Sequence, residues 1–450
     1  TDGDMATLAG LTETGNAYTI TITDKTVDST ALNELDAKTT VAVNASAVTI
    51  LTGTAAAANT AYASSGISGL ANEAITLEDT TLASSVLNTL DGNTTGAVNA
   101  STVTILTGTA AAANTAYASG GITGLGNEAV TLSDTTLAAS VLNTLDGNTT
   151  GAVNASTVTT LTGTAAVVNT ALGSSGISGL GNEAVTISDT SITASVLNTL
   201  DGNTTGAVNA ATVTTINGSA ADANTAYASS GISGLGNEVV VLSDSSVVAS
   251  VLNTLDGNTT GAVNAHNITT ITGTAADANT AYASGGIAGL DSETVTISDT
   301  SLASTVLNTL DGNTTGTVNA ATVTTLTGAA AAVITTYDSS GISGLGNEKL
   351  TLSGSTSVAN ANTLAADTTG VITATITETD ASTLATLNET TNAYTITVGD
   401  TSVTAANLNT IDGATTVAVT ATAVTTITGA AAAVITTYDS SGISGLGNEK

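Results

Sequence analysis

Residues 121–125 read Gly-Ile-Thr-Gly-Leu, and versions of this pentapeptide recur every 55 residues along most of the chain. A fixed period of this kind is typical of repeat proteins, in which each unit packs against its neighbours instead of around one central core. The 450 residues are therefore expected to form one continuous repetitive structure. The pentapeptides begin at Gly66, Gly121, Gly176, Gly231, Gly286 and Gly341.

The composition limits the possible partners. Four basic residues stand against 36 Asp and Glu, and the resulting net charge of -32 argues against a surface that binds nucleic acid. Only 9% of the residues are charged, however, and 41% are hydrophobic, so the chain has enough apolar surface to bury and is expected to fold.

Several kinds of stabilisation and targeting are missing from the sequence. There is no Cys, Pro, Trp or Phe, which excludes disulfides and leaves stability to stacked backbone and small side chains. No apolar stretch approaches the length needed to span a bilayer. Residues 1–18 resemble residues 377–394, and the final Glu449-Lys450 repeats Glu348-Lys349, so both ends are expected to lie inside repeats of a longer array or of a stacking subunit.

The first half of a repeat predicts a strand followed by a short helix. Residues 129–134, Ala-Val-Thr-Leu-Ser-Asp, alternate like a short strand. Apolar residues at helical spacing follow over residues 137–145. Asp134 or Thr135 is placed to cap this helix at its N-terminus, and Gly147 lies just beyond its C-terminus.

The second half repeats the plan. Residues 158–163 predict a strand and residues 165–172 a second short helix. Each repeat then consists of two rungs, with Gly-Ile-Ser-Gly-Leu-Gly-Asn-Glu as an insertion between rungs. We expect one parallel sheet to run along the whole structure, with right-handed crossovers.

One divergent unit supports the division into rungs. Gly354 replaces the repeated Asp, the next such residue is Asp400, and the pentapeptide is missing between them. What remains is two rungs of about 23 residues, similar in length to leucine-rich repeats. The predicted fold is a β-rich repeat solenoid with short helices, made of tandem repeats over 1–353, a divergent unit over 354–399 and a returning unit over 400–450.

Repeated carboxylates suggest a metal site. Two rows of aspartates would stack at the repeat spacing, and hard cations such as calcium would relieve their mutual repulsion. Capping and turn formation are the alternative role of these residues, because the calcium-binding nonapeptide and the spacing of an EF-hand loop are both absent. The rows are Asp79, Asp134, Asp189, Asp244 and Asp299, and Asp91, Asp146, Asp201, Asp256 and Asp311.

Threonines offer a second kind of surface. Thr19, Thr21 and Thr23 alternate on one face of a strand, as do Thr102 and Thr104, and flat Thr ladders can bind ice. The strand preference of Thr explains the same pattern without a ligand. The hydroxyls could also carry O-linked sugars, and Asn93-Thr94-Thr95 matches the short acceptor pattern for N-glycosylation.

The remaining candidates favour packing over chemistry. A tyrosine recurs at one position of the repeat, but Leu172 replaces it once, which favours a half-buried packing role. His266 is the only histidine and occurs in one copy of the repeat. Without Cys or a base beside a nucleophile, no catalytic site is expected. The tyrosines are Tyr62, Tyr117, Tyr227, Tyr282 and Tyr337.

The register of residues 134–155, Asp-Thr-Thr-Leu-Ala-Ala-Ser-Val-Leu-Asn-Thr-Leu-Asp-Gly-Asn-Thr-Thr-Gly-Ala-Val-Asn-Ala, resembles the repetitive regions of very large secreted or cell-surface bacterial proteins, particularly those of cyanobacteria. The resemblance covers most of the chain and is partly compositional. It implies an extracellular or cell-surface location and a role in adhesion, surface layers, sheaths or filaments.

Three functions follow as hypotheses. The first is an extracellular structural protein that assembles with copies of itself, end to end or laterally, into a filament, sheath or coat. The second is the spacer or ligand-binding region of a giant adhesin, which could depend on calcium or bind glycans. The third is an ice-binding Thr ladder.

Overall fold

The computed structural model describes residues 3–447 and 449–450 and contains parallel strand–helix repeats. The chain divides into two compact units, residues 1–214 with 225–235, and residues 215–224 with 236–450. The predicted change of repeat at 354 falls inside the second unit. Helix α9 (Ala220–Ala228) contains the division between residues 224 and 225.

The repeat over residues 129–178 shows the order of elements. Two strands lie before the longer helix. Two more strands lie between it and the shorter helix, and the second of these directly precedes the shorter helix. The predicted strands over 129–134 and 158–163 and the predicted helix over 165–172 are confirmed to within two residues of their bounds. The first helix was expected directly after a cap at Asp134 or Thr135, but residues 136–138, including Leu137, form a strand and the helix begins at Ala139. The elements are β10 (Ala129–Leu132), β11 (Thr136–Ala138), α6 (Ala139–Asn148), β12 (Val153–Asn154), β13 (Thr160–Gly163), α7 (Ala165–Gly173) and β14 (Ile177–Ser178).

The helices form because small and apolar residues recur on one face at every third position. Helix α6 buries Ala139, Leu142 and Leu145, and α7 buries the smaller Ala165 and Ala171 with Val168. Each of these side chains is almost completely shielded from solvent, and burial of a single Leu stabilises the fold by roughly 1.5–3 kcal/mol. We call each helix with its flanking strands a half-repeat.

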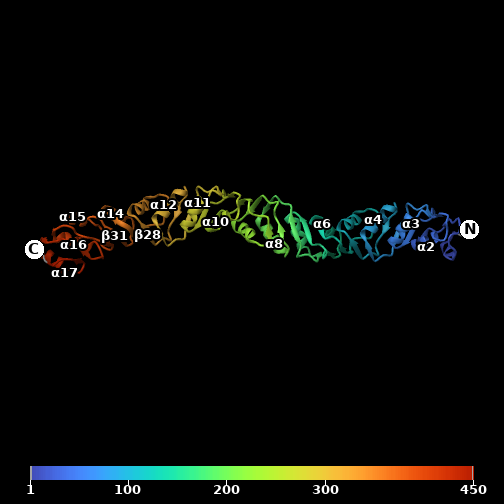
Figure 1. Cartoon of the computed structure of the whole chain (residues 1–450), viewed down its shortest axis with the longest axis horizontal. Coiled ribbons are helices and arrows are strands. Elements are labelled where there is room, and N and C mark those ends of the chain that lie inside the picture. The colour runs from blue at the N-terminus through green and yellow to red at the C-terminus, as the bar shows by residue number, and fades with distance from the viewer. Residues whose placement is uncertain (1–2, 448) are drawn as a thin grey trace. The chain divides into compact units, whose positions relative to one another are not determined.

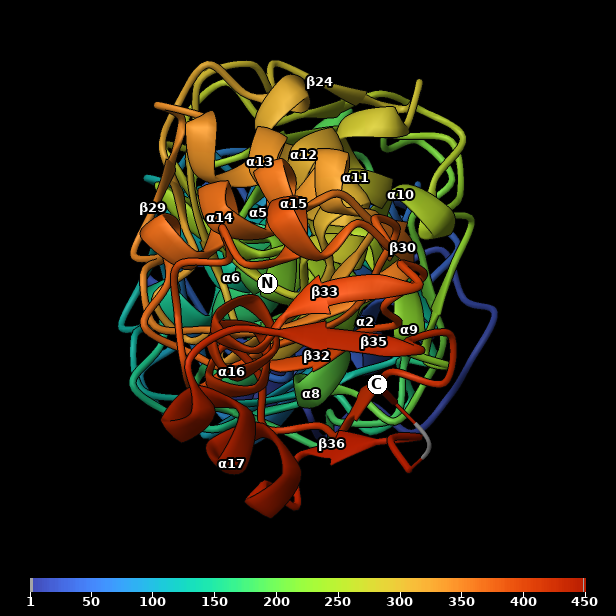
Figure 2. The same ribbon diagram turned by 90° about the vertical axis from the view of Figure 1, so that its left-hand side faces the viewer.

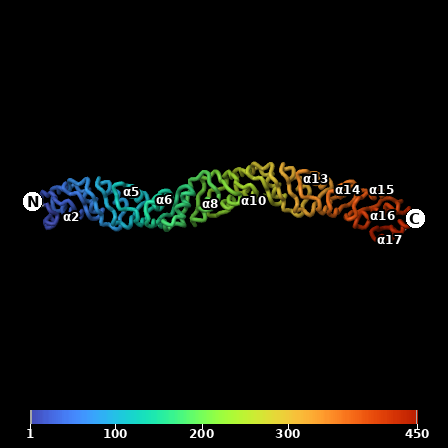
Figure 3. Tube along the Cα trace, turned by 180° about the vertical axis from the view of Figure 1, so that it is seen from behind, coloured from blue at the N-terminus to red at the C-terminus, as the bar shows by residue number. Residues whose placement is uncertain are grey.

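The first unit repeats this order. Figure 1 shows its helices following one another in chain order, and Figure 3 shows the same order in the Cα trace. The other helices are α1 (Met5–Leu8), α2 (Ser29–Asp36), α3 (Ala55–Ala63), α4 (Ser84–Asn93), α5 (Ala110–Ala118) and α8 (Ala194–Asn203). The other strands are β1 (Thr26–Asp28), β2 (Val43–Asn44), β3 (Ile50–Gly53), β4 (Ile67–Ser68), β5 (Ala74–Leu77), β6 (Thr81–Ala83), β7 (Val98–Asn99), β8 (Ile105–Gly108), β9 (Ile122–Thr123), β15 (Ala184–Ile187), β16 (Ser191–Thr193), β17 (Val208–Asn209) and β19 (Ile232–Ser233).

Every strand pairing in this unit is parallel and joins neighbouring half-repeats. Thr136 of β11 pairs with Thr160 of β13, which pairs in turn with Ala184 of β15. The strands form three five-stranded sheets, which begin with the strands directly before α2, α4 and α6 and end with an Ile-Ser or Ile-Thr strand. The sheets have the orders β1-β3-β5-β7-β9, β6-β8-β10-β12-β14 and β11-β13-β15-β17-β19, and β2 pairs with β4.

Two sequence-based expectations are therefore wrong. No single sheet runs along the chain, because a new sheet starts in each repeat while the preceding one is still being extended. The Gly-Ile-Ser-Gly-Leu segment is also not an insertion between rungs. Its Ile177 and Ser178 form β14, which pairs with Val153 and Asn154 of β12 and completes the sheet.

The second unit continues the same plan. Its helices are α10 (Ala249–Asn258), α11 (Ala275–Ala283), α12 (Ser304–Asn313), α13 (Ala330–Asp338), α14 (Val358–Asp367), α15 (Ala381–Leu384), α16 (Ala405–Gly413) and α17 (Ala431–Asp439). Its strands are β18 (Thr215–Gly218), β20 (Val239–Leu242), β21 (Ser246–Val248), β22 (Val263–Asn264), β23 (Thr270–Gly273), β24 (Ile287–Ala288), β25 (Thr294–Ile297), β26 (Ser301–Ala303), β27 (Val318–Asn319), β28 (Thr325–Gly328), β29 (Ile342–Ser343), β30 (Lys349–Thr356), β31 (Ile372–Ile376), β32 (Ala393–Thr395), β33 (Ser402–Thr404), β34 (Val419–Thr420), β35 (Thr426–Thr428) and β36 (Ile443–Ser444).

The sheets of this unit are also parallel. Figure 2 shows β33 and β35 side by side near its C-terminal end, with α16 next to them. The strands that belong to this unit are ordered β18-β20-β22-β24, β21-β23-β25-β27-β29, β26-β28-β30-β31-β32, β33-β35 and β34-β36 within their sheets. The divergent segment stays within this arrangement, because the two strands that precede a longer helix elsewhere are fused here into the eight-residue β30.

Asparagines connect each helix to the next. The Asn88 Nδ2 of α4 donates to the Ala112 carbonyl of α5, at 2.8 Å, and the Asn114 Nδ2 of α5 donates to the Val141 carbonyl of α6, at 2.9 Å. The amides of Asn33, Asn59, Asn143 and Asn169 continue the same ladder in the first unit. Packing and hydrogen bonding thus act between the same neighbours.

A carboxylate that recurs at the same position of the repeats lies close to one of their glycines. A Cβ on Gly121 would overlap the Asp91 carboxylate, which accepts a hydrogen bond from the Ser119 hydroxyl at 2.7 Å. A Cβ on the adjacent Gly120 would meet no atom within 4 Å. A larger residue would therefore displace a neighbouring side chain at Gly121 but not at Gly120.

We expect Gly121→Ala to lower the free energy of unfolding by about 1–3 kcal/mol, because the carboxylate has to move out of its hydrogen bond. Gly120→Ala is the matched control and should change it little. Urea unfolding followed by circular dichroism measures both. Equal effects of the two substitutions would contradict the assigned position of Asp91.

Candidate functional site

The first row of aspartates caps helices of the preceding half-repeat. The Oδ2 of Asp134 accepts a hydrogen bond from the Ala110 N–H, the first in α5, at 2.8 Å. The Thr109 side chain accepts from the Ala112 N–H of the same helix. A carboxylate and a hydroxyl therefore satisfy two of the four free N–H groups and complement the positive end of the helix dipole.

The other members of the row have the same role. Asp79, Asp189, Asp244 and Asp299 accept from the first N–H of α3, α7, α9 and α11, respectively, at 2.7–2.8 Å. Capping was the alternative to calcium in the sequence, but the capped helix was predicted wrongly. Helix α6, which follows Asp134, begins after Ala138 without a side-chain cap, because β11 separates it from Asp134.

The second row of aspartates binds the turns after the shorter helices. Asp91 and Asp146 accept from the hydroxyls of Ser119 and Ser174, both at 2.7 Å, and each serine also accepts from a glycine N–H two residues later. Asp201, Asp256 and Asp311 bind Ser229, Ser284 and Ser339 in the same way.

The structure does not bring the two rows together around one point. Within residues 3–447 and 449–450, no three Asp, Glu or His side chains lie close enough to hold a metal ion. Each of these carboxylates already accepts a hydrogen bond from a backbone N–H or a serine hydroxyl of the same chain. Calcium binding by these residues stays a prediction that the geometry does not favour.

A row of buried glutamates was missed by the sequence analysis. Glu128 is completely buried, and its Oε2 accepts hydrogen bonds from the Tyr117 hydroxyl at 3.0 Å and from the Gly126 N–H at 2.8 Å. Its Oε1 is buried without a partner. The available signal was the constant spacing between Tyr117 and the Gly-Asn-Glu triplet. The buried row consists of Glu73, Glu128, Glu183, Glu238, Glu293 and Glu348.

The repeated tyrosines are half-buried, as their occasional replacement by Leu predicted. Burial raises the pKa of the Tyr117 phenol well above its usual range, and the charge of Glu128 acts in the same direction, while a hydrogen bond with Thr149 opposes both. The pKa values of Tyr62, Tyr282 and Tyr337 are raised for the same main reason. Burial raises the pKa of Tyr394 to about 12.

The other sequence candidates have structural contacts. Thr102 and Thr104 are exposed, as are Thr19, Thr21 and Thr23. The hydroxyls of Thr102 and Thr104 donate to the backbone carbonyls of Leu77 and Thr80. The Asn93 Nδ2 of the glycosylation pattern donates to the Asn59 Oδ1 at 2.8 Å. The Nδ1 of His266 forms a hydrogen bond with the Oδ1 of Asn264.

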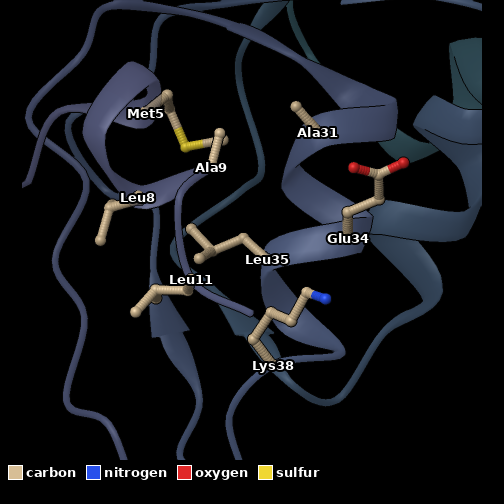
Figure 4. A pocket seen from close by; sticks show the side chains of 8 residues that line it. All are labelled: Met5, Leu8, Ala9, Leu11, Ala31, Glu34, Leu35 and Lys38. Carbon is tan, nitrogen blue, oxygen red and sulfur yellow. The ribbon is translucent and has the colours of Figure 1, made fainter. Parts of the chain in front are cut away.

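A small pocket lies between α1 and α2. Figure 4 shows Met5, Leu8, Ala9 and Leu11 from the α1 segment facing residues of α2. The α2 side contributes Ala31, Glu34, Leu35 and Lys38. The lining is mainly apolar and contains no nucleophile beside a base, so it does not form a recognisable catalytic site.

The comparisons with known proteins do not connect this chain to a family or a function. No protein-family model, curated protein or solved structure matches this chain. Among the described residues, no helix is both long enough and apolar enough to cross a membrane.

Asp134→Ala should weaken the start of α5 by about 1 kcal/mol, because the Ala110 N–H loses its cap. Hydrogen exchange of the Ala110 amide should become several-fold faster. Asp134→Asn keeps an oxygen that can accept the same bond and serves as the control. An unchanged Ala110 exchange rate in the alanine variant would contradict the capping role.

The raised tyrosine pKa values predict loss of stability in alkali. Unfolded tyrosines ionise near pH 10, whereas the buried ones stay protonated to higher pH. Their contribution is therefore complete below about pH 10 and declines as the pH rises from there towards the folded pKa. Tyr117→Phe should flatten this decline in urea unfolding measured at a series of pH values. An identical pH dependence in the variant would count against the assignment.

Proposed function

We propose that this chain is an extracellular structural repeat protein whose half-repeats close into a parallel solenoid and whose copies associate into a filament, sheath or surface coat. One observation carries the proposal. The polar side chains that recur with the repeat bond to backbone or side chains of neighbouring half-repeats, as Asp134 does to Ala110 and Asn88 to Ala112. Such a pattern serves the stacking of repeats and does not assemble a site for chemistry.

The strand pairing supports closure into a solenoid. Each strand with a described partner pairs in parallel with a strand of a neighbouring half-repeat, and parallel crossovers are right-handed in nearly all proteins. Helices of successive half-repeats also contact one another within each unit. A closed winding is the arrangement that places both kinds of contact between the same neighbours.

A spacer in a large adhesin is the second candidate. The same stacking of half-repeats would serve it equally, and the resemblance of residues 134–155 to cell-surface bacterial repeats favours it. The version of this function in which the Gly-Ile-Ser-Gly-Leu segments form a free binding face has less support, because Ile177 and Ser178 are paired within a sheet.

Electron microscopy of the 450-residue chain, with calcium and with a chelator, tests assembly directly. We expect regular assemblies in both conditions. Assemblies only with calcium would assign the aspartate rows to a metal-dependent contact, and isolated particles in both would favour the spacer.

A further inference from the structure

The Gly-Leu-Gly-Asn-Glu loops are fastened by a tyrosine in some repeats and not in one. Loops 124–128, 179–183 and 344–348 have identical sequences. In the first and third, a tyrosine hydroxyl donates to the buried glutamate, from Tyr117 to Glu128 at 3.0 Å and from Tyr337 to Glu348 at 2.8 Å. Both glutamates also accept from the glycine N–H two residues earlier.

The loop at 179–183 lacks this hydroxyl. Leu172 occupies the tyrosine position, and the Oε2 of Glu183 accepts from the Gly181 N–H, at 2.8 Å. Glu183 is nevertheless completely buried, and its Oε1 has no partner. The Oε1 atoms of Glu128 and Glu348 also lack a partner, so Glu183 differs from them by the missing tyrosine hydrogen bond. A buried carboxylate with fewer donors gains more from contact with water than one with more donors.

The helix before this loop is weaker at both ends than its counterpart. The Thr164 side chain makes no capping bond at the start of α7, whereas Thr109 caps α5. Gly173 is the last residue of α7, where α5 has Ala118, and Gly disfavours helix. Val168, completely buried in the middle of α7, fills the space of the smaller Ala113 and anchors the centre of the helix. The helix is therefore weakened at both of its ends, and the C-terminal one leads into the loop.

We infer that residues 172–183 form the place where the first unit opens first, a conformational device created by the loss of one tyrosine hydroxyl. Opening here lets Glu183 reach water. It also releases β14 from β12, and β14 is the last strand of its sheet. Local openings of this kind are what native-state hydrogen exchange detects.

Exchange of the loop amides tests the inference with internal controls. The Gly126, Gly181 and Gly346 amides have the same flanking residues, so their exchange rates in an unfolded chain are closely similar. We expect the Gly181 amide to exchange about tenfold or more faster than the other two. The reason is that its acceptor, Glu183, lacks the hydrogen bond from a tyrosine hydroxyl that holds Glu128 and Glu348 in place. Equal rates at the three positions would overturn the inference.

Substitutions separate the hydroxyl from the bulk of the side chain. Leu172→Tyr should slow Gly181 exchange towards the Gly126 rate, and Leu172→Phe, which adds a ring without a hydroxyl, should not. Tyr117→Phe removes the hydroxyl that binds Glu128 and should therefore make Gly126 exchange faster. An equal slowing by Tyr and Phe at 172, or an unchanged Gly126 rate in Tyr117→Phe, would overturn the role of the hydroxyl.

Discussion

The parallel pairing of strands that lie 20–24 residues apart in the sequence determines how the repeats stack, as between Thr136 and Thr160 or between Thr373 and Ala393. This offset is shorter than half of the 55-residue repeat. Strands that pair therefore stand at different positions relative to the helices. Along one sheet, β11 directly precedes a longer helix, β13 a shorter one, and β19 follows a shorter one. The largest sheets have five strands, and within a unit the next sheet begins before the preceding one ends, so consecutive repeats are tied by overlapping sheets.

Polar side chains add hydrogen bonds between the same neighbouring half-repeats, although few residues of the chain are charged. Asp134 caps a helix that starts 24 residues earlier, and the Asn88 amide reaches a carbonyl 24 residues later. These bonds satisfy backbone groups at helix ends and between helices, where an unpaired buried group would cost about 1–3 kcal/mol. A chain without disulfides or large aromatic residues other than tyrosine thus obtains specificity from hydrogen bonds repeated at every step.

Much of the local structure could be predicted from the sequence. The strand at 129–132 and the helix at 165–173 follow from alternation and helical spacing. The register could not be predicted, because local patterns do not say which strands pair. This is why Ile177-Ser178 was interpreted as an insertion although it is a strand, and why Asp134 was assigned to the following helix. The buried Glu128 was missed because its burial depends on Tyr117 and on the turn that contributes the Gly126 N–H, which only the folded loop brings together.

Disulfide trapping measures the strand register most directly, because the chain contains no cysteine of its own. We predict that the pair Thr136→Cys and Thr160→Cys oxidises readily, since these residues are partners in neighbouring parallel strands. The pair Thr136→Cys and Thr164→Cys represents an offset near half of the repeat and should oxidise slowly. Faster oxidation of the second pair would contradict the staggered sheets on which the whole account depends.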